Sequence, residues 1–145
     1  MVARLAAAGC VAAEEEAAEL LAAAGDPAEL DAMVTRRTRG EPLAWVVGAV
    51  DFCGIRVKVA AGVYVPRWQT EPLARRAAAL LPADGTAVDL CTGAGAIACV
   101  LQASARGATV VATDVDPAAV ACARENGVDA LLGDLDGPLP AALGG

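Results

Sequence analysis

Residues 87–95, Ala-Val-Asp-Leu-Cys-Thr-Gly-Ala-Gly, constrain the fold more than any other part of the chain. The first four of these residues predict a short, largely apolar strand, and the glycines after them predict a tight loop. Residues 96–106 have a helical pattern and begin where the loop ends. A strand, a glycine loop and a helix in this order place backbone N–H groups and a helix N-terminus against a bound ligand. We therefore expect an α/β fold with a nucleotide-like ligand beside this loop.

Two kinds of cofactor compete for the glycine loop. Gly93, Gly95 and Ala98 match the dinucleotide fingerprint G-x-G-x-x-G/A, and Asp114 follows at about the distance expected of a ribose-binding acid. Asp89 argues against a dinucleotide, because its carboxylate would face the two negative charges of a pyrophosphate. S-adenosylmethionine carries an ammonium and a sulfonium group, which a carboxylate attracts. The sequence favours this methyl donor, and a strand–helix turn without any ligand is the remaining alternative.

Two more strands and another helix are predicted after the first strand and its helix. Residues 108–112 and 130–132 are apolar runs, and Asp116-Pro117 between them predicts a capped helix that ends near Asn126-Gly127. This βαβαβ series with short loops is typical of a parallel sheet, where ligands bind beyond the carboxyl ends of the strands. An aspartate lies at the end of each predicted strand; we expect the one at the second strand to bind both ribose hydroxyls and the one at the third to lie near the adenine amino group. These strand-end acids are Asp89, Asp114 and Asp134.

The first third of the chain predicts a small helical unit. Residues 2–24 are rich in strong helix formers, with a possible break at Gly9, and Asp26-Pro27-Ala28-Glu29 predicts the capped start of a second helix. That helix is expected to end near Arg39. Three arginines in its last turn either complement the negative helix end or contact an acidic or RNA-containing partner, and the sequence leaves both interpretations open. They are Arg36, Arg37 and Arg39.

The pattern changes from helical to alternating after Gly48. Ile-Arg-Val-Lys-Val at residues 55–59 alternates cleanly, and Cys53-Gly54 supplies the bend of a β-hairpin. Residues 66–72 are expected to open the next helix, with Thr70 as its N-cap. The Arg, Trp and Glu side chains of this segment are compatible with a cofactor pocket or with a capped turn at the surface, and the sequence leaves both open. We expect three parts: a helical unit at 1–47, a hairpin linker at 48–62 and a cofactor-binding domain at 63–145.

Composition narrows the function classes. The formal net charge of −7 over 145 residues argues against nucleic-acid binding driven by the field of the whole protein. The chain has no histidine and no C-x-x-C pair, so zinc sites and histidine-based catalysis lack their usual groups, and we expect no metal. Five widely spaced cysteines fit reduced thiols. Since neither a signal peptide nor a membrane-spanning run is found, we expect a soluble, cytoplasmic monomer.

Several motifs resemble the peptide chain release factor glutamine methyltransferases. Arg36-Arg37, followed by Gly-Glu-Pro-Leu-Ala-Trp at residues 40–45, is similar to the family's Arg-Arg…Gly-Glu-Pro…Tyr segment, and Phe52-Cys53-Gly54 is similar to its hairpin. Pro-Arg-Trp-Gln-Thr-Glu at residues 66–71 is similar to its Pro-Arg-Pro-x-Thr-Glu motif, and residues 89–95 to its Asp-Leu-Gly-Thr-Gly-Ser-Gly loop. The loop is common to many methyltransferases, so the other motifs make the resemblance specific. It covers nearly the whole chain.

The resemblance implies a small N-terminal helical unit and a hairpin, followed by the first half of a Rossmann-like class I methyltransferase domain. It also implies methyl transfer from S-adenosylmethionine to a glutamine side-chain amide in a Gly-Gly-Gln loop of a translation release factor, with the helical unit helping to hold that protein. The implied cofactor-binding residues are Arg67, Thr70, Glu71, Asp89, Cys91, Thr92, Gly93, Ala94, Gly95, Asp114, Val115, Asp134 and Leu135.

The sequence departs from the family pattern in ways that bear on activity. Trp68 stands in place of a proline, Cys91 of a glycine and Ala94 of a serine, which suggests a divergent branch whose substrate need not be the same. The family's Asn-Pro-Pro-Tyr motif, which can accept both N–H bonds of the substrate amide and aim its lone pair, does not occur. No residue is therefore assigned to catalysis.

We expect the chain to be the N-terminal part of a methyltransferase, with residues 87–90 as an open, apolar sheet edge. We further expect it to bind the methyl donor weakly and to turn over nothing. Two alternatives remain: the NAD-binding half of a dehydrogenase, and a non-catalytic module in which the arginines of the helical unit bind a protein or RNA.

Overall fold

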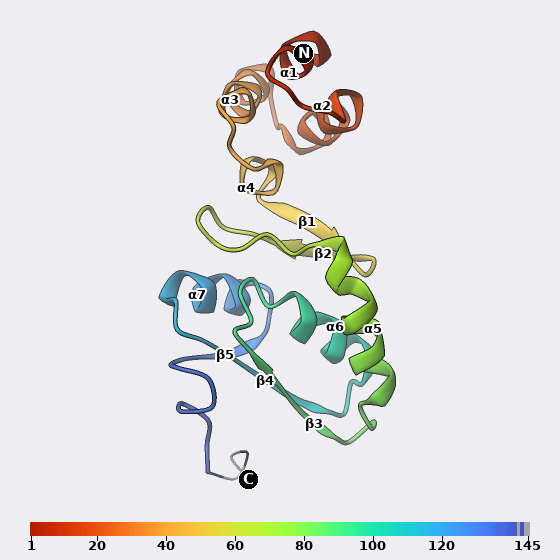
Figure 1. Ribbon diagram of the computed structural model, residues 1–145, viewed down its shortest axis with the longest axis vertical. Coiled ribbons are helices and arrows are strands. Elements are labelled where there is room, and N and C mark those ends of the chain that lie inside the picture. Colours follow the sequence, from red (N-terminus) through yellow and green to blue (C-terminus); the bar gives the residue numbers. More distant parts are fainter. Residues whose placement is uncertain (142, 144–145) are drawn as a thin grey trace. The chain divides into compact units, whose positions relative to one another are not determined.

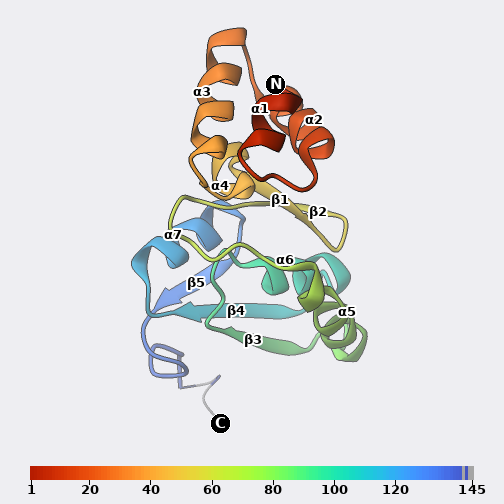
Figure 2. The same cartoon turned by 45° about the horizontal axis from the view of Figure 1, so that its top comes forward.

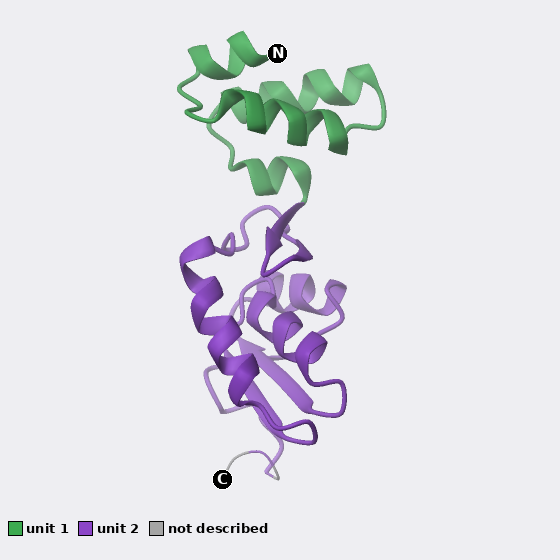
Figure 3. Ribbon diagram, turned by 90° about the vertical axis from the view of Figure 1, so that its right-hand side faces the viewer, with its two compact units in different colours: residues 1–48 green, residues 49–145 purple. Residues whose placement is uncertain are grey.

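The computed structural model describes residues 1–141 and 143. The chain forms two compact units, Met1–Gly48 and Ala49–Gly145, which Figure 3 shows in green and purple. The hairpin belongs to the second unit by its contacts. The functional division at residues 1–47, 48–62 and 63–145 stays a prediction.

The first unit is helical, as expected. Residues 8–12 separate the first two helices, and Gly9 adopts a φ of +87°, which a glycine reaches without strain. The expected cap at Asp26 is confirmed, because its carboxylate accepts hydrogen bonds from two backbone amides at the start of the next helix, both at 2.8 Å. The four helices are α1 (Val2–Ala7), α2 (Ala13–Ala23), α3 (Pro27–Thr38) and α4 (Leu43–Val47).

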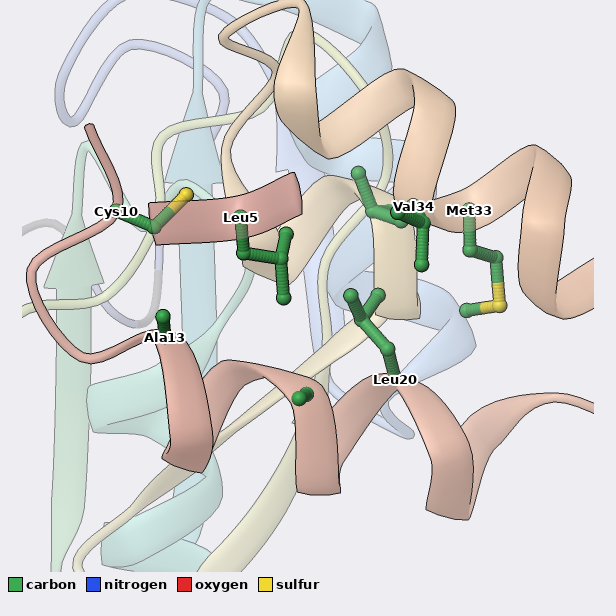
Figure 4. Packing of buried hydrophobic residues seen from close by; sticks show 8 residues of the cluster. Leu5, Cys10, Ala13, Leu20, Met33 and Val34 are labelled. Carbon is green, nitrogen blue, oxygen red and sulfur yellow. The ribbon is translucent and has the colours of Figure 1, made fainter. Parts of the chain in front are cut away.

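A core of apolar side chains holds the first unit together (Figure 4). Leu5 of α1 and Leu20 of α2 are fully buried and meet Met33 and Val34 of α3. Each fully buried leucine stabilises the unit by about 1.5–3 kcal/mol relative to an exposed one. The unit therefore has a core of its own, although alanine supplies much of the apolar surface of α1 and α2.

Two of the three clustered arginines form ion pairs within this unit. The Arg36 guanidinium donates to both carboxylate oxygens of Glu41, and the Arg37 guanidinium binds both oxygens of Glu16 at 2.6 and 2.9 Å. The side chains of Arg37 and Glu16 are only 20% and 14% exposed, and the hydrogen bonds from Arg37 lower the pKa of Glu16. The Arg-Arg…Gly-Glu-Pro segment is thus held together by ion pairs, and Arg36 and Arg37 both have partners within the helical unit.

The second unit begins with the hairpin and continues into three parallel strands (Figure 1). Its strands are β1 (Ala49–Phe52), β2 (Ile55–Lys58), β3 (Thr86–Leu90), β4 (Thr109–Asp114) and β5 (Asp129–Leu132). Its helices are η1 (Trp68–Thr70), α5 (Glu71–Leu80), α6 (Ala96–Ser104) and α7 (Pro117–Glu125). The alternation of strands and helices predicted from the sequence is confirmed, and the fold is α/β.

The hairpin turn is confirmed at the expected residues. Cys53 and Gly54 have φ angles of +53° and +81°, as a two-residue type I′ turn requires, and Phe52 pairs with Ile55 across it. Phe52 and Val57 are almost fully buried. The hairpin is therefore anchored by its side chains as well as by its turn.

The sheet has the order β3-β4-β5, with all pairs parallel and with α6 and α7 on the same face (Figures 1 and 2). Its core is made of small residues: Ala98 of α6, Ala112 of β4 and Ala123 of α7 are fully buried. The aspartate at position 116 caps α7, as expected. None of the helices in the described residues is long and apolar enough to cross a bilayer.

Two details of the expected helices are wrong. The helix after the glycine loop ends at Ser104, two residues early. Thr70 precedes α5 but makes no capping bond, because its backbone is already helical (φ −87°, ψ −14°) where η1 runs into α5. A side-chain cap requires an extended backbone at that position.

In the described residues β3 lies at the edge of its sheet, where an open edge was expected. A cavity of about 440 Å³ runs along it. Its lining includes Leu73, Ala77 and Leu80 of α5, together with Ala87 and Val88 of β3. The edge therefore presents unpaired backbone groups beside apolar side chains.

Candidate cofactor-binding site

The glycine loop between β3 and α6 has a left-handed backbone at three positions. Cys91, Gly93 and Gly95 have φ angles of +57°, +58° and +83°. A Cβ at Gly95 would lie 3.0 Å from Val128 Cγ2 and 3.1 Å from Ala123 Cβ, whereas a Cβ at Gly93 would meet nothing within 4 Å. Gly95 is thus required for its φ and for close packing on α7, and Gly93 for its φ alone.

Asp89 lies near the end of β3 with its side chain turned into the start of α6. Its Oδ2 accepts hydrogen bonds from Thr92 Oγ1 at 2.7 Å and from the backbone N–H of Ala98 at 3.2 Å. Asp89 is 9% exposed, and burial raises the pKa of its carboxyl group; the two hydrogen bonds oppose this shift, and the nearby Asp114 adds to it. Within the described residues no donor bonds to Oδ1, which remains for a ligand.

Asp114 is the last residue of β4, and its side chain binds the backbone of the glycine loop and of the loop before α7. Its Oδ2 accepts from the Gly93 N–H at 2.8 Å, and its Oδ1 accepts from the Asp116 N–H at 2.9 Å. The Thr92 N–H also donates to the Thr113 carbonyl, at 3.0 Å. Each carboxylate oxygen of Asp114 accepts only one of these bonds, and an ionised carboxylate has about four acceptor positions. It can therefore accept further bonds from a pair of hydroxyl groups.

The segment after β5 lies against β4. The Gly133 N–H donates to the Asp114 carbonyl at 3.0 Å, and the Thr113 hydroxyl donates to the Leu135 carbonyl at 2.7 Å. Asp134 lies in the sequence between Gly133 and Leu135, the two residues that make these bonds, and it is exposed. The three predicted acids therefore lie at or just beyond the carboxyl ends of adjacent parallel strands.

Exposed apolar side chains stand next to the strand-end acids. Val115, directly after β4, is 70% exposed, and Leu135, after β5, is 51% exposed. Exposed apolar residues beside hydrogen-bonding carboxylates are suited to a flat, partly polar ring such as adenine. Among the described residues no three His, Cys, Asp or Glu side chains are grouped so that they would hold a metal ion.

The residues predicted from the Pro-Arg-Trp-Gln-Thr-Glu motif make contacts elsewhere. The Arg67 guanidinium lies 5.9 Å from the centre of the Tyr64 ring, and Glu71 forms an ion pair with Arg75 at 2.9 Å. In the described part of the chain no hydrogen bond joins Arg67, Thr70 or Glu71 to the glycine loop or to the strand-end acids. Their place in a cofactor site remains a prediction.

Sequence reasoning missed Asn126. The sequence indicates only that Asn126 ends a helix, but its side-chain amide donates to the carbonyl of Ala94 in the glycine loop at 2.8 Å and also binds the backbone of Lys58 in the hairpin. An Asn-Gly pair at a helix end is common for backbone reasons alone, so the sequence carried no signal of these contacts.

Comparison with known proteins shows which families this sequence is similar to. A model of the family "Methyltransferase small domain" matches residues 69–132. A release factor glutamine methyltransferase of Mycolicibacterium smegmatis is 39% identical over 121 residues, which cover 78% of this chain and 43% of that protein. Those of Neisseria gonorrhoeae and Escherichia coli are each 38% identical over 99 residues, which cover 68% of this chain and 36% of each protein.

The chain thus spans about two fifths of the length of these curated relatives. The family-model match includes the glycine loop and strands β3, β4 and β5, and it ends before Asp134. By its sequence, the chain belongs to the release factor glutamine methyltransferase family.

Proposed function

We propose that the second unit binds S-adenosylmethionine at the carboxyl ends of β3, β4 and β5. The proposal depends on the surroundings of the Asp89 carboxylate, which is buried. Its Oδ2 accepts hydrogen bonds from Thr92 and Ala98, while its Oδ1 has no partner among the described residues. A buried negative charge requires a positive partner, which the ammonium and sulfonium groups of this cofactor provide. A pyrophosphate would instead add negative charge beside Asp89 and Asp114.

Each remaining residue of the site has a role under this proposal. Asp114 accepts both ribose hydroxyls while Gly93 holds its Oδ2 in place. Asp134 binds the adenine amino group, and Val115 and Leu135 pack against the faces of the ring. The backbone of the glycine loop approaches the amino-acid part of the cofactor, which supplies an activated methyl group. The remaining predicted contacts of the loop are Cys91, Thr92, Ala94 and Gly95.

We further propose that the methyl group is transferred to a glutamine side-chain amide in a translation release factor. The helical unit at residues 1–47 helps to hold that release factor. The names of the curated relatives and the Gly-Glu-Pro and Pro-Arg-x-x-Thr-Glu motifs support this. Because the sequence holds no Asn-Pro-Pro-Tyr motif, no side chain is assigned to accept the two amide N–H bonds. The 145-residue chain by itself should therefore bind the cofactor weakly and transfer no methyl group.

Calorimetry on the purified chain tests the cofactor. We expect heat of binding with S-adenosylmethionine and S-adenosylhomocysteine and none with NAD. Binding of NAD alone would identify a dinucleotide site, and binding of none of the three would leave the non-catalytic module. Methylation is tested separately, with a radiolabelled methyl donor and a release factor carrying a Gly-Gly-Gln loop; incorporation of label would contradict the expected inactivity.

A further inference from the structure

The side chain of Asn126 links two segments that are far apart in the sequence. Its Oδ1 accepts from the Lys58 N–H at 2.8 Å, while its Nδ2 donates to the Lys58 carbonyl at 2.9 Å and to the Ala94 carbonyl at 2.8 Å. The orientation of the amide is dictated by its partners, because a backbone N–H can only donate and a carbonyl can only accept. Asn126 therefore joins the end of β2 to the glycine loop.

The Ala94 carbonyl lies just before α6 and outside the hydrogen-bond ladder of that helix. The helix begins at Ala96 and the first i→i−4 bond runs from Cys99 to the Gly95 carbonyl, so the N–H of Ala98 has no partner within the helix and donates to Asp89. Ala94 is buried, so its carbonyl needs a donor from elsewhere, and Asn126 supplies it. Asp89 and Asn126 therefore satisfy two backbone groups at the start of α6, one within its first turn and one just before it.

The donor capacity of Asn126 is fully used. Its amide has two hydrogens, and the two shortest bonds are those to the carbonyls of Lys58 and Ala94. A third carbonyl, that of Cys122, lies at 3.3 Å and already accepts from the backbone N–H of Asn126. Loss of the side chain would leave the Ala94 carbonyl buried without a donor.

We propose that Asn126 is a positioning residue for the glycine loop. By holding the Ala94 carbonyl it fixes the backbone between Gly93, whose N–H binds Asp114, and Gly95, which packs on α7. The effect on cofactor affinity rests on the proposed function, whereas the effect on the loop does not. Asn126 acts through the loop and makes no contact with the cofactor.

Cys122 provides a matched control. Its Sγ accepts from the Ala60 N–H and donates to the Lys58 carbonyl, both at 3.4 Å, so it holds the hairpin to α7 just as Asn126 does. It makes no bond to the glycine loop. Cys122→Ala therefore loosens the hairpin anchor without removing the donor to Ala94.

The experiment is amide hydrogen exchange measured by NMR on the ligand-free chain. The reporting amides are those of Gly93, bonded to Asp114, and Gly95, bonded to the Thr92 carbonyl. We expect Asn126→Ala to speed their exchange about fivefold or more, as the loss of one hydrogen bond implies, and Cys122→Ala to change it less than about twofold. Amides in α2 and α3 are the internal reference and should not change.

Asn126→Asp carries the test if Asn126→Ala does not fold. The aspartate keeps the acceptor for Lys58 but turns an oxygen toward the Ala94 carbonyl, so it should also speed exchange at Gly93 and Gly95 about fivefold or more. Unchanged exchange in the Asn126 variants would overturn the proposal. Equal acceleration by Cys122→Ala would also overturn it, because the effect would then come from the hairpin anchor.

Calorimetry with S-adenosylmethionine on the same variants separates this inference from the proposed function. We expect both Asn126 variants to weaken binding about fivefold or more and Cys122→Ala to weaken it less than about twofold. If the unaltered chain binds no S-adenosylmethionine, the cofactor assignment fails, while the exchange rates still decide whether Asn126 holds the loop.

Discussion

Replacing Asp89 by asparagine removes the negative charge from the site while keeping its shape. The amide oxygen of Asp89→Asn can still accept from Thr92 Oγ1 and from the Ala98 N–H, which places the NH₂ group where Oδ1 faces the ligand. A hydrogen bond to a charged group contributes about 1.5–3 kcal/mol. Loss of about 2 kcal/mol corresponds to ~30-fold weaker binding of S-adenosylmethionine, at about 1.4 kcal/mol per tenfold. Calorimetry near neutral pH measures this difference directly.

The same substitution should make the folded protein more stable, because burial raises the pKa of Asp89 in the folded state. Between the unfolded and the folded pKa the native state holds the extra proton, so the free energy of unfolding falls as the pH rises through that window. The Asp89→Asn variant has no carboxyl group to ionise, so its free energy of unfolding does not fall in this way. Its stability advantage in urea denaturation should therefore be largest near neutral pH and should shrink as the pH falls below the folded pKa.

Asp116→Asn is the matched control for both measurements. It removes a charge of the same sign at an exposed residue after β4, and asparagine remains a good cap for α7. We expect its affinity and stability to stay close to those of the unaltered chain. If Asp89→Asn bound the cofactor as tightly as the control, the charge argument would be refuted; if it were less stable than the control at neutral pH, the burial argument would be refuted.

Three further perturbations test other parts of the structure. Gly95→Ala adds a clash with α7 to an unfavourable φ and should lower the free energy of unfolding by about 1 kcal/mol more than Gly93→Ala, which meets open space, as measured in urea. Glu16→Gln should lower the free energy of unfolding of the helical unit, measured by thermal denaturation, by about 2 kcal/mol, whereas Glu15→Gln at the exposed neighbouring residue should change it very little. Because the pKa of Glu16 is lowered in the folded state, the stabilisation by its ion pair is lost as the pH falls through that pKa. Val88→Lys places a charge on the open edge of β3 and should reduce concentration-dependent self-association in sedimentation velocity; unchanged association would show that this edge does not pair.

Local signals in the sequence were sufficient for most of the fold. Asp26-Pro27 and Asp116-Pro117 combine a capping side chain with a proline at the first helical position, and both start helices. Cys53-Gly54 lies between two alternating runs and forms the hairpin turn. Each of these patterns depends on residues within about one turn of each other, where backbone preferences decide the outcome. The strand-end acids could be predicted for a similar reason, since the order of elements alone brings the ends of parallel strands together.

Long-range contacts could not be predicted in this way. Arg37 pairs with Glu16, 21 residues earlier, and Asn126 binds Lys58, 68 residues earlier. Nothing in the spacing of these residues indicates a partner at such a distance. Thr70 shows the converse failure: its residue type predicted a cap, but the helical turn before it decides its backbone conformation. The sequence therefore predicted the positions of the strand-end acids better than the side chains that hold the glycine loop in place.

The groups that hold the glycine loop act at the start of α6. The buried Asp89 accepts from the N–H of Ala98 in the first turn of α6, which has no partner within the helix. Just before the helix, the Ala94 carbonyl accepts from Asn126, which also binds Lys58 in the hairpin. Hydrogen bonds of Asn126 thus connect the hairpin to the loop that lies beside Asp89. This connection gives a physical reason why the hairpin packs in the same unit as the glycine loop.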